Sequence, residues 1–208
     1  MLMKNIPKLQ AGFTIIELMI TLVVAGALLA VGMPAMREFV QNARITSVTN
    51  ELVSALMLAR SEAIRQNTQA CVCPTTNTTL AAPLCAANGN WETGWIAFSD
   101  FNGDCVINGA APNTDQLLKV WDGTAYAGGL TVRNDNASIN GVNAVVFNNR
   151  GEPFAAGNNQ SGNFSICDDR TPIFDAMGNT RNAAAVTVNA AGRTRSTRQQ
   201  TFITYTAP

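Results

Sequence analysis

Residues 18–36 form a run of nineteen uncharged, mostly apolar positions. Between Lys8 and Arg37 the only ionisable side chain is Glu17. At about 1.5 Å per residue, a helix of this length just crosses a hydrocarbon core of roughly 30 Å. Lys4 and Lys8 place its start on the cytoplasmic side by the positive-inside rule. The pattern therefore predicts one membrane-spanning helix near the N-terminus.

Beyond Pro34 the apolar residues recur every three or four positions, as they do in an amphipathic helix. This stripe consists of Ile45, Val48, Leu52, Ala55, Leu56, Ala59 and Ala63. We expect one helix from about Phe13 to Gln66, whose amphipathic half, residues 37–67, is the spine of a globular domain. Pro34 lacks a backbone donor and therefore predicts a kink or local melting between the two halves.

After Asn67 the chain changes to short β-like runs separated by turns rich in Asn, Gly and Pro. The expected strands are Gln69–Cys73, Trp95–Ser99, Gln116–Trp121, Leu130–Arg133, Ala144–Phe147, Asn163–Cys167 and Ala184–Asn189. We therefore expect an α+β fold, with the long helix packed on one head, residues 68–208, of mostly antiparallel sheet.

Composition removes most enzyme classes. The 208 residues include no histidine, and only 13% of them are charged. Without histidine, Ser-His-Asp and Cys-His machinery and two-histidine zinc sites are excluded, so we expect no enzyme and no cofactor. The charged fraction is about half of the roughly 25% that is usual for globular proteins, and such surfaces are common outside the cytoplasm.

The zero net charge hides an asymmetry along the chain. Residues 13–175 hold eight basic and fourteen acidic side chains. Residues 176–208 hold no acid, and their basic residues are Arg181, Arg193, Arg195 and Arg198. A neutral protein has therefore concentrated positive charge in its last 33 residues.

All five cysteines lie in the expected head. In an oxidising compartment they can form up to two disulfides and leave one thiol over. Cys73 and Cys85 bracket a polar loop of eleven residues and make the most favoured pair. Cys105 and Cys167 are the other disulfide candidates, and the sequence leaves the remaining connectivity, including Cys71, open.

Two motifs resemble metal sites, and we expect neither to bind a metal. Cys71 and Cys73 are separated by one residue, which is not the usual zinc spacing, and no histidine assists them. The acidic stretch 100–104 resembles the start of a calcium loop. However, Cys105 and Ala111 stand where an EF-hand loop requires glycine and glutamate. A turn rich in Asp, Asn and Gly is the better interpretation.

The segment Gly12-Phe13-Thr14-Ile15-Ile16-Glu17-Leu18 resembles the processing motif of type IV pilins and type II secretion pseudopilins. Pro34 falls where those proteins carry a helix-breaking proline. An ordinary cleaved secretory signal is the alternative, but it explains neither the carboxylate inside the apolar segment nor the helical pattern that continues beyond it. The resemblance to pilins accounts for both features.

That resemblance implies how the N-terminus is processed and assembled. A prepilin peptidase would cut after Gly12, remove the leader, residues 1–12, and leave Phe13 as an N-methylated first residue. Glu17, which costs roughly 2–3 kcal/mol at membrane depth without a partner, would neutralise the terminal amine of a neighbouring subunit. Residues 13–36 would then lie first in the inner membrane and later in the core of a periplasmic or extracellular pilus, among other major and minor pilins.

Further residues narrow the resemblance. The stretches Ala59–Ile64, Cys73-Pro74 and Trp91–Asp100 are similar to those of the GspH/FimT/FimU group of minor pilins. Gly192-Arg193-Thr194-Arg195 resembles the GRxR signature near the end of FimT proteins. This last resemblance implies capture of double-stranded DNA by a type IV pilus during natural transformation.

Elementary chemistry is compatible with that role. Arg193 and Arg195 are two positions apart and would share one side of an extended segment, with Arg198 within reach. Guanidinium groups bind phosphate oxygens with paired hydrogen bonds. Gly192 would let the backbone turn or approach a phosphate closely. No recognition helix is visible in the pattern, so we expect binding that does not depend on DNA sequence.

Three alternatives to DNA binding stay open. The arginines can solvate an exposed strand, or pair with Asp168, Asp169 and Asp175, and such surface ion pairs are worth little. The chain can be a structural minor pilin that initiates or caps the filament without binding DNA. It can also be a GspH-like pseudopilin of a type II secretion system.

Overall fold

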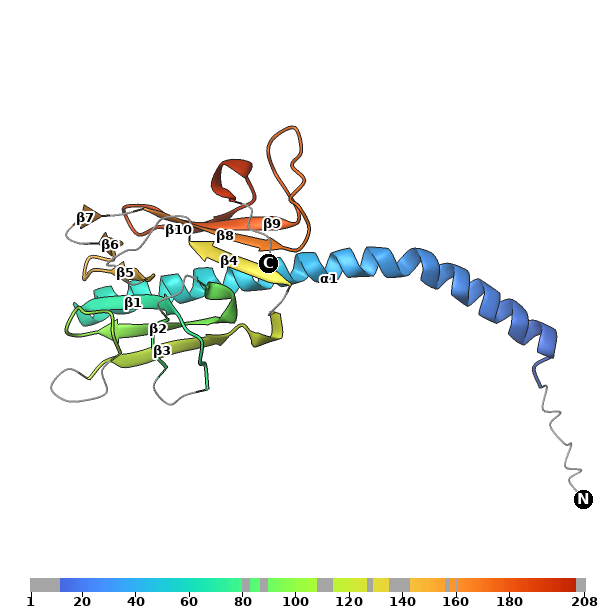
Figure 1. Ribbon diagram of the computed structural model, residues 1–208, viewed down its shortest axis with the longest axis horizontal. Helices are drawn as coiled ribbons and strands as arrows, with labels where there is room; N and C mark the ends of the chain where they lie inside the picture. The colour runs from blue at the N-terminus through green and yellow to red at the C-terminus, as the bar shows by residue number, and fades with distance from the viewer. Residues whose placement is uncertain are drawn as a thin grey trace, which may run out of the picture. The chain divides into compact units, whose positions relative to one another are not determined.

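The computed structural model describes residues 12–79, 83–86, 90–107, 114–126, 129–134, 143–155, 158–159 and 161–204. The chain divides into two compact units, Met1–Val40 and Gln41–Pro208. Helix α1 (Ile15–Gln66) supplies residues to both of them (Figure 1). Most of the predicted leader, residues 1–11, lies outside the described residues.

Both ends of α1 are fixed by local hydrogen bonds. The helix begins two residues later than predicted because Thr14 caps it, with its hydroxyl oxygen accepting the backbone N–H of Glu17 at 3.2 Å. At the other end Asn67 has a φ of 53°, in the left-handed region. The N–H groups of Thr68 and Asn67 donate to the carbonyls of Ala63 and Ile64, respectively, which is the Schellman pattern.

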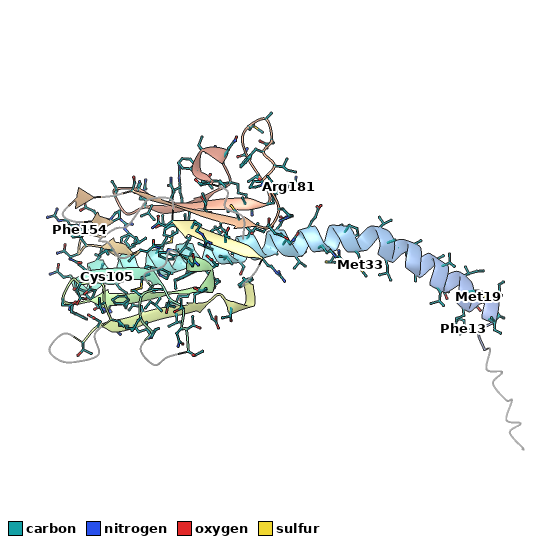
Figure 2. All side chains as sticks on the ribbon, in the orientation of Figure 1. Phe13, Met19, Met33, Cys105, Phe154 and Arg181 are labelled. Carbon is teal, nitrogen blue, oxygen red and sulfur yellow. A yellow bond between two sulfur atoms is a disulfide. The ribbon has the colours of Figure 1, made fainter. Side chains whose placement is uncertain are left out.

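In the first unit the helix carries apolar side chains that are exposed in this single chain, as Met19 and Met33 show in Figure 2. Its most apolar window of 18 residues has a mean hydropathy of 2.4, so the helix is long and apolar enough to cross a membrane. The helix continues through Pro34 without a break, so the local melting that we considered there does not occur. The kink stays a prediction.

In the second unit α1 packs between two antiparallel sheets (Figure 1). The first sheet has the order β3-β2-β1-β5 and contains β1 (Gln69–Pro74), β2 (Gly94–Asp100), β3 (Gln116–Asp122) and β5 (Val145–Phe147). The second has the order β10-β9-β8-β4 and contains β4 (Leu130–Asn134), β8 (Gly162–Asp168), β9 (Ala183–Val188) and β10 (Thr194–Thr197).

Short elements complete the head. They are the strand pair β6 (Phe154–Ala155) and β7 (Asn158–Asn159) and the 3₁₀ turns η1 (Trp91–Thr93), η2 (Thr124–Tyr126) and η3 (Gln200–Phe202). The seven strands expected from the sequence are all present, and their observed ends differ from the predicted ends by at most one residue. Strand β10 and the β6–β7 pair were not expected.

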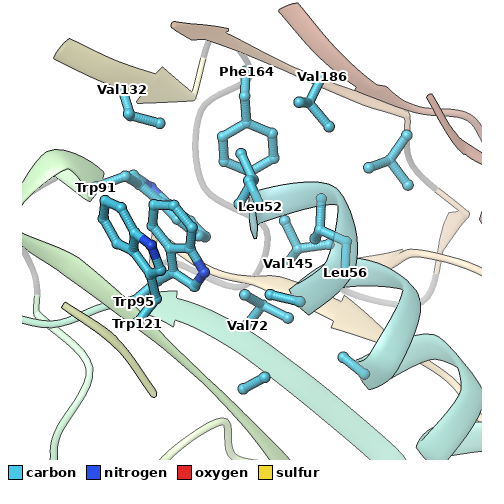
Figure 3. Packing of buried hydrophobic residues seen from close by; sticks show 14 of the residues in the cluster. Leu52, Leu56, Val72, Trp91, Trp95, Trp121, Val132, Val145, Phe164 and Val186 are labelled. Atoms are coloured by element: carbon cyan, nitrogen blue, oxygen red, sulfur yellow. The ribbon is translucent and has the colours of Figure 1, made fainter. Parts of the chain in front are cut away.

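The core explains why one helix needs two sheets. The buried stripe of α1 places Leu52 and Leu56 where they meet side chains of both sheets, such as Val72 on one side and Phe164 on the other (Figure 3). Burying one such side chain contributes about 1.5–3 kcal/mol. Trp95 and three further aromatic residues extend this core beside the helix; the Trp95 and Trp121 rings stack at 3.8 Å and the Trp91 and Phe164 rings meet edge to face at 4.8 Å.

A second buried cluster covers the other face of the first sheet, and it contains both disulfides. Cys73 is bonded to Cys85, the pair favoured from the sequence, and Cys71 is bonded to Cys105. Because Cys71 and Cys73 are two apart on β1, they point to the same face of the sheet. The two disulfides use the other four cysteines, so the prediction that Cys167 is a disulfide candidate was wrong. Cys167 lies on β8 of the other sheet, and its thiol donates to the Thr204 carbonyl.

The acidic stretch after β2 is a compact loop built on Asp100. The Asp100 carboxylate accepts the backbone N–H groups of Gly103 at 2.7 Å and Cys105 at 2.8 Å. Asn102 donates to the Asp104 carboxylate. Within the described ranges, no group of three His, Cys, Asp or Glu side chains is arranged to hold a metal ion.

Candidate nucleic-acid interface

The arginine-rich segment is the second half of a hairpin made by β9 and β10. The side-chain oxygen of Asn189 accepts the backbone N–H groups of Ala191 at 3.1 Å and Arg193 at 2.8 Å. The Asn189 backbone N–H donates to the Arg193 carbonyl, and the Gly192 N–H donates to the Asn189 carbonyl. We had predicted an extended segment here. In the structure this segment is an ordered strand, β10, which pairs with β9 along its length.

Gly192 serves the contact between two turns. Its φ is 73°, a conformation that glycine adopts at little cost. A Cβ atom at this position would lie 1.8 Å from the carbonyl oxygen of Gly151 in another turn. The sequence had suggested that Gly192 lets the backbone turn or approach a phosphate closely; the glycine does lie in a turn, and the packing of the head itself requires it there.

Arg193 and Arg195 are both exposed. Arg195 lies opposite Thr187 in the β9–β10 register, on the face of the sheet that points away from the core residues Val186 and Val188. Its guanidinium carbon is 5.8 Å from the centre of the Phe202 ring, within the range of a cation–π contact. Among the described residues, neither guanidinium forms an ion pair or a hydrogen bond.

Arg198 has a different environment. Its guanidinium donates to the carbonyl of Arg181 and, at 3.0 Å, to the hydroxyl of Thr46 on α1. Burial lowers the pKa of this guanidinium from its usual value. Arg198 therefore ties the end of β10 to the helix, and much of its hydrogen-bonding capacity is used inside the head.

The three acids that could have neutralised these arginines are engaged elsewhere. Asp168 pairs with Arg170. The Asp175 carboxylate accepts two backbone N–H groups of its own turn, and Asp169 accepts the side-chain amide of Gln41 at 3.4 Å. In the part of the chain that the structure describes, none of the three pairs with Arg193 or Arg195.

The sequence did not indicate what holds this hairpin in place. Arg60 of α1 donates through Nε to the Gly151 carbonyl at 2.8 Å and through Nη2 to the Ala191 carbonyl at 3.0 Å. These contacts join positions 91 and 131 residues apart. Arg60 stands in one of the stretches that carried the family resemblance, but no local pattern reveals its partners.

The predicted processing residues lie before or at the start of α1. Gly12 and Phe13 precede the helix and are exposed. Glu17 lies in the first turn and is exposed, and the described part of the chain offers its carboxylate no partner.

Comparison with known proteins agrees with this organisation. Residues 7–33 match the sequence model of the prokaryotic N-terminal methylation motif. Residues 48–197 match the family described as type II transport protein GspH. An apolar N-terminal helix with a methylation motif, followed by a β-rich head built on the continuation of that helix, defines the pilin-like class of proteins. Within this class, the chain belongs to the GspH family.

Solved structures with a similar fold include two crystal forms of the type IV minor pilin FimU from Pseudomonas aeruginosa strain PAO1. One is 19% identical, with a TM-score of 0.45 over 73% of this chain and 90% of the other. The second is 20% identical, with a TM-score of 0.47 over 76% and 90%. None of the curated proteins compared with the chain matches it.

Proposed function

We propose that this chain is a minor pilin of a type IV pilus, and that Arg193 and Arg195 bind double-stranded DNA without sequence preference for uptake in natural transformation. The observation that carries the proposal is the pair of exposed guanidinium groups on an ordered hairpin, with no acidic partner among the described residues. Before assembly the chain would be anchored in the inner membrane, processed by a prepilin peptidase after Gly12, and joined to other pilins through Glu17.

Duplex DNA carries one negative charge for about every 1.7 Å of helix axis, and cations that neutralise phosphates release counterions. A site of two guanidinium groups gives weak binding for one subunit, in the micromolar range or weaker at physiological salt by order of magnitude. Several copies, or neighbouring pilins, would raise the affinity through avidity. Arg198, which we included from the sequence, would act mainly by fixing the end of β10.

The test is a titration of fluorescent duplex of random sequence with the full chain in nonionic detergent, at several salt concentrations. The double variant Arg193→Gln/Arg195→Gln is expected to bind much more weakly, with a salt slope shallower by about 1.8, since each phosphate contact contributes about 0.9. The matched control is Arg44→Gln/Lys119→Gln, which removes the same charge from α1 and β3. Equal binding by both double variants would show that the hairpin is not the site.

The match to the GspH family favours one second candidate, a pseudopilin of type II secretion. A chromosomal Arg193→Gln/Arg195→Gln strain separates the two functions. Loss of DNA uptake with intact pili supports DNA capture. A second strain lacks the whole gene for this chain. If that strain loses secretion of exoproteins but takes up DNA normally, the pseudopilin is supported; if it loses its pili, a purely structural minor pilin is supported.

A further inference from the structure

The turn that meets the arginine hairpin is built in the same way as the hairpin turn itself. The side-chain oxygen of Asn148 accepts the backbone N–H groups of Arg150 at 2.9 Å and Glu152 at 3.0 Å. The Gly151 N–H donates to the Asn148 carbonyl, and Gly151 has a φ of 74°. Asn189 and Gly192 make the corresponding bonds in the hairpin. An exposed arginine therefore sits beside the glycine in each turn: Arg150 before it, Arg193 after it.

Arg60 holds these two turns together. Its guanidinium donates to a carbonyl of each turn, through Nε to Gly151 and through Nη2 to Ala191. A guanidinium presents its donors in a rigid planar fork, so both carbonyls are fixed relative to one another. The two glycines permit the close approach, since a Cβ on Gly192 would overlap the Gly151 carbonyl.

This contact brings Arg150 close to Arg193. A Cβ on Gly192 would lie 1.8 Å from the Gly151 oxygen. Consecutive Cα atoms are about 3.8 Å apart, so the Cα atoms of Arg150 and Arg193 are separated by roughly 13 Å at most. Two long side chains can converge on one stretch of polyanion across that distance.

The charges around Arg150 leave it available. In the described ranges its guanidinium has no hydrogen bond and no ion pair. The nearest acid in sequence, Glu152, accepts the side-chain amide of Asn148 at 3.1 Å. On the neighbouring end of α1, Glu62 is paired with Arg65.

From this juxtaposition we propose that Arg150 is a third phosphate-binding residue of the DNA interface, and that Arg60 is the positioning residue that holds it beside Arg193. The inference rests on the proposed function and extends it. The interface then joins the turn that follows β5 of the first sheet to the C-terminal hairpin of the second sheet, and three guanidinium groups contact the DNA backbone.

The first test is Arg150→Gln in the full chain, titrated with the same random-sequence duplex. At about 0.1 M salt the affinity is expected to fall about fivefold to tenfold, and the salt slope to become shallower by about 0.9, as for the loss of one phosphate contact. Lys119→Gln, which removes one charge from β3, is the control and is expected to leave the slope unchanged. An unchanged slope for Arg150→Gln would overturn the proposal.

The same titrations separate this inference from the proposed function. If Arg193→Gln/Arg195→Gln weakens binding and Arg150→Gln does not, only the role of Arg150 fails. If none of these variants weakens binding, the proposed function fails as well.

The role of Arg60 is tested with Arg60→Lys, which keeps the charge but removes the fork. In the wild-type background Arg60→Lys is expected to weaken DNA binding severalfold. In the background of Arg150→Gln and Arg193→Gln its effect is expected to be much smaller, because the two guanidinium groups that Arg60 aligns are then absent. An equal effect in both backgrounds would make Arg60 merely structural. Should Arg60→Lys not fold, Arg60→Gln, which also removes the fork, provides the second variant for this cycle.

Discussion

At the scale of single residues, three turns of the head have the same pattern of hydrogen bonds. Each begins with Asn or Asp, whose side chain accepts the N–H groups two and four positions later, and each has glycine with positive φ at the fourth position. The surroundings of the glycines differ. Gly151 and Gly192 face each other, whereas a Cβ on Gly178 would meet nothing closer than 3.8 Å.

This difference predicts unequal costs for the same substitution. Gly178→Ala is expected to cost about 1–2 kcal/mol, since an L-residue is strained in the left-handed region. Gly192→Ala adds a clash with the Gly151 carbonyl and is expected to cost more than about 3 kcal/mol. Urea unfolding followed by tryptophan fluorescence measures both, because all three tryptophans lie in the head. Equal costs would contradict the close contact of the two turns.

Asp100 predicts a pH dependence of stability. Burial raises the pKa of its carboxyl, with Asp115 and Asp104 adding to the effect, although the N–H groups of Cys105 and Gly103 oppose it. The folded state then binds the proton more tightly than the unfolded state, whose aspartate pKa is about 3.9. The contribution of this group to stability therefore rises as the pH falls from 7 and is lost as the pH rises through the elevated pKa.

The measurement compares wild type with Asp100→Asn, which cannot titrate. The difference in free energy of unfolding, wild type minus variant, is expected to shift in favour of the wild type between pH 7 and pH 4. A difference that is flat over this range, or that shifts in favour of the variant at low pH, would refute the raised pKa.

At the scale of elements, α1 is the piece on which both sheets depend. Its buried stripe is wide enough to meet side chains of β1, β2 and β5 on one side and of β4, β8 and β9 on the other. The periodicity predicted this stripe, and it predicted seven of the strands, all of them in the two four-stranded sheets. It missed β10 because Thr-Arg-Ser-Thr has no apolar alternation, and this strand exists because the edge of β9 pairs with it.

The central place of α1 predicts contrasting effects on its two faces. Leu52 is fully buried between the sheets, whereas Met57 is 51% exposed. Leu52→Ala is expected to cost about 2–5 kcal/mol through lost burial and a cavity. Met57→Ala is expected to change stability by no more than about 0.5 kcal/mol. The same urea unfolding measures both variants, and similar costs would argue against the helix being the common core of the two sheets.

At the scale of the whole molecule, the two units have separate physical requirements. The apolar side chains of the first unit need a membrane or other subunits. Every residue of the two buried clusters belongs to the second unit, since the first of them is Ile45. Both disulfides also lie there.

The separation predicts that residues 41–208 fold without the first unit. Made as an exported fragment, this head is expected to be soluble and to melt within about 4 °C of the full chain in detergent, a shift that corresponds to about 1 kcal/mol for a chain of this size. Circular dichroism melts of the two proteins provide the comparison. A fragment that is unfolded, or much less stable, would show that the apolar unit contributes to the core.

The long helix, seven of the strands, the gathering of the cysteines in the head and the arginine-rich end could be predicted from the sequence, because each is encoded in composition or in a periodicity of neighbouring positions. The folded chain was needed to show the division into two sheets, the partner of Cys71 and the engagement of Arg198 by Thr46 and the Arg181 carbonyl. It alone placed Arg150 beside Arg193. Those features depend on contacts between distant positions, such as the bonds of Arg60 to two separate turns, and such contacts leave no pattern in the local order of residues.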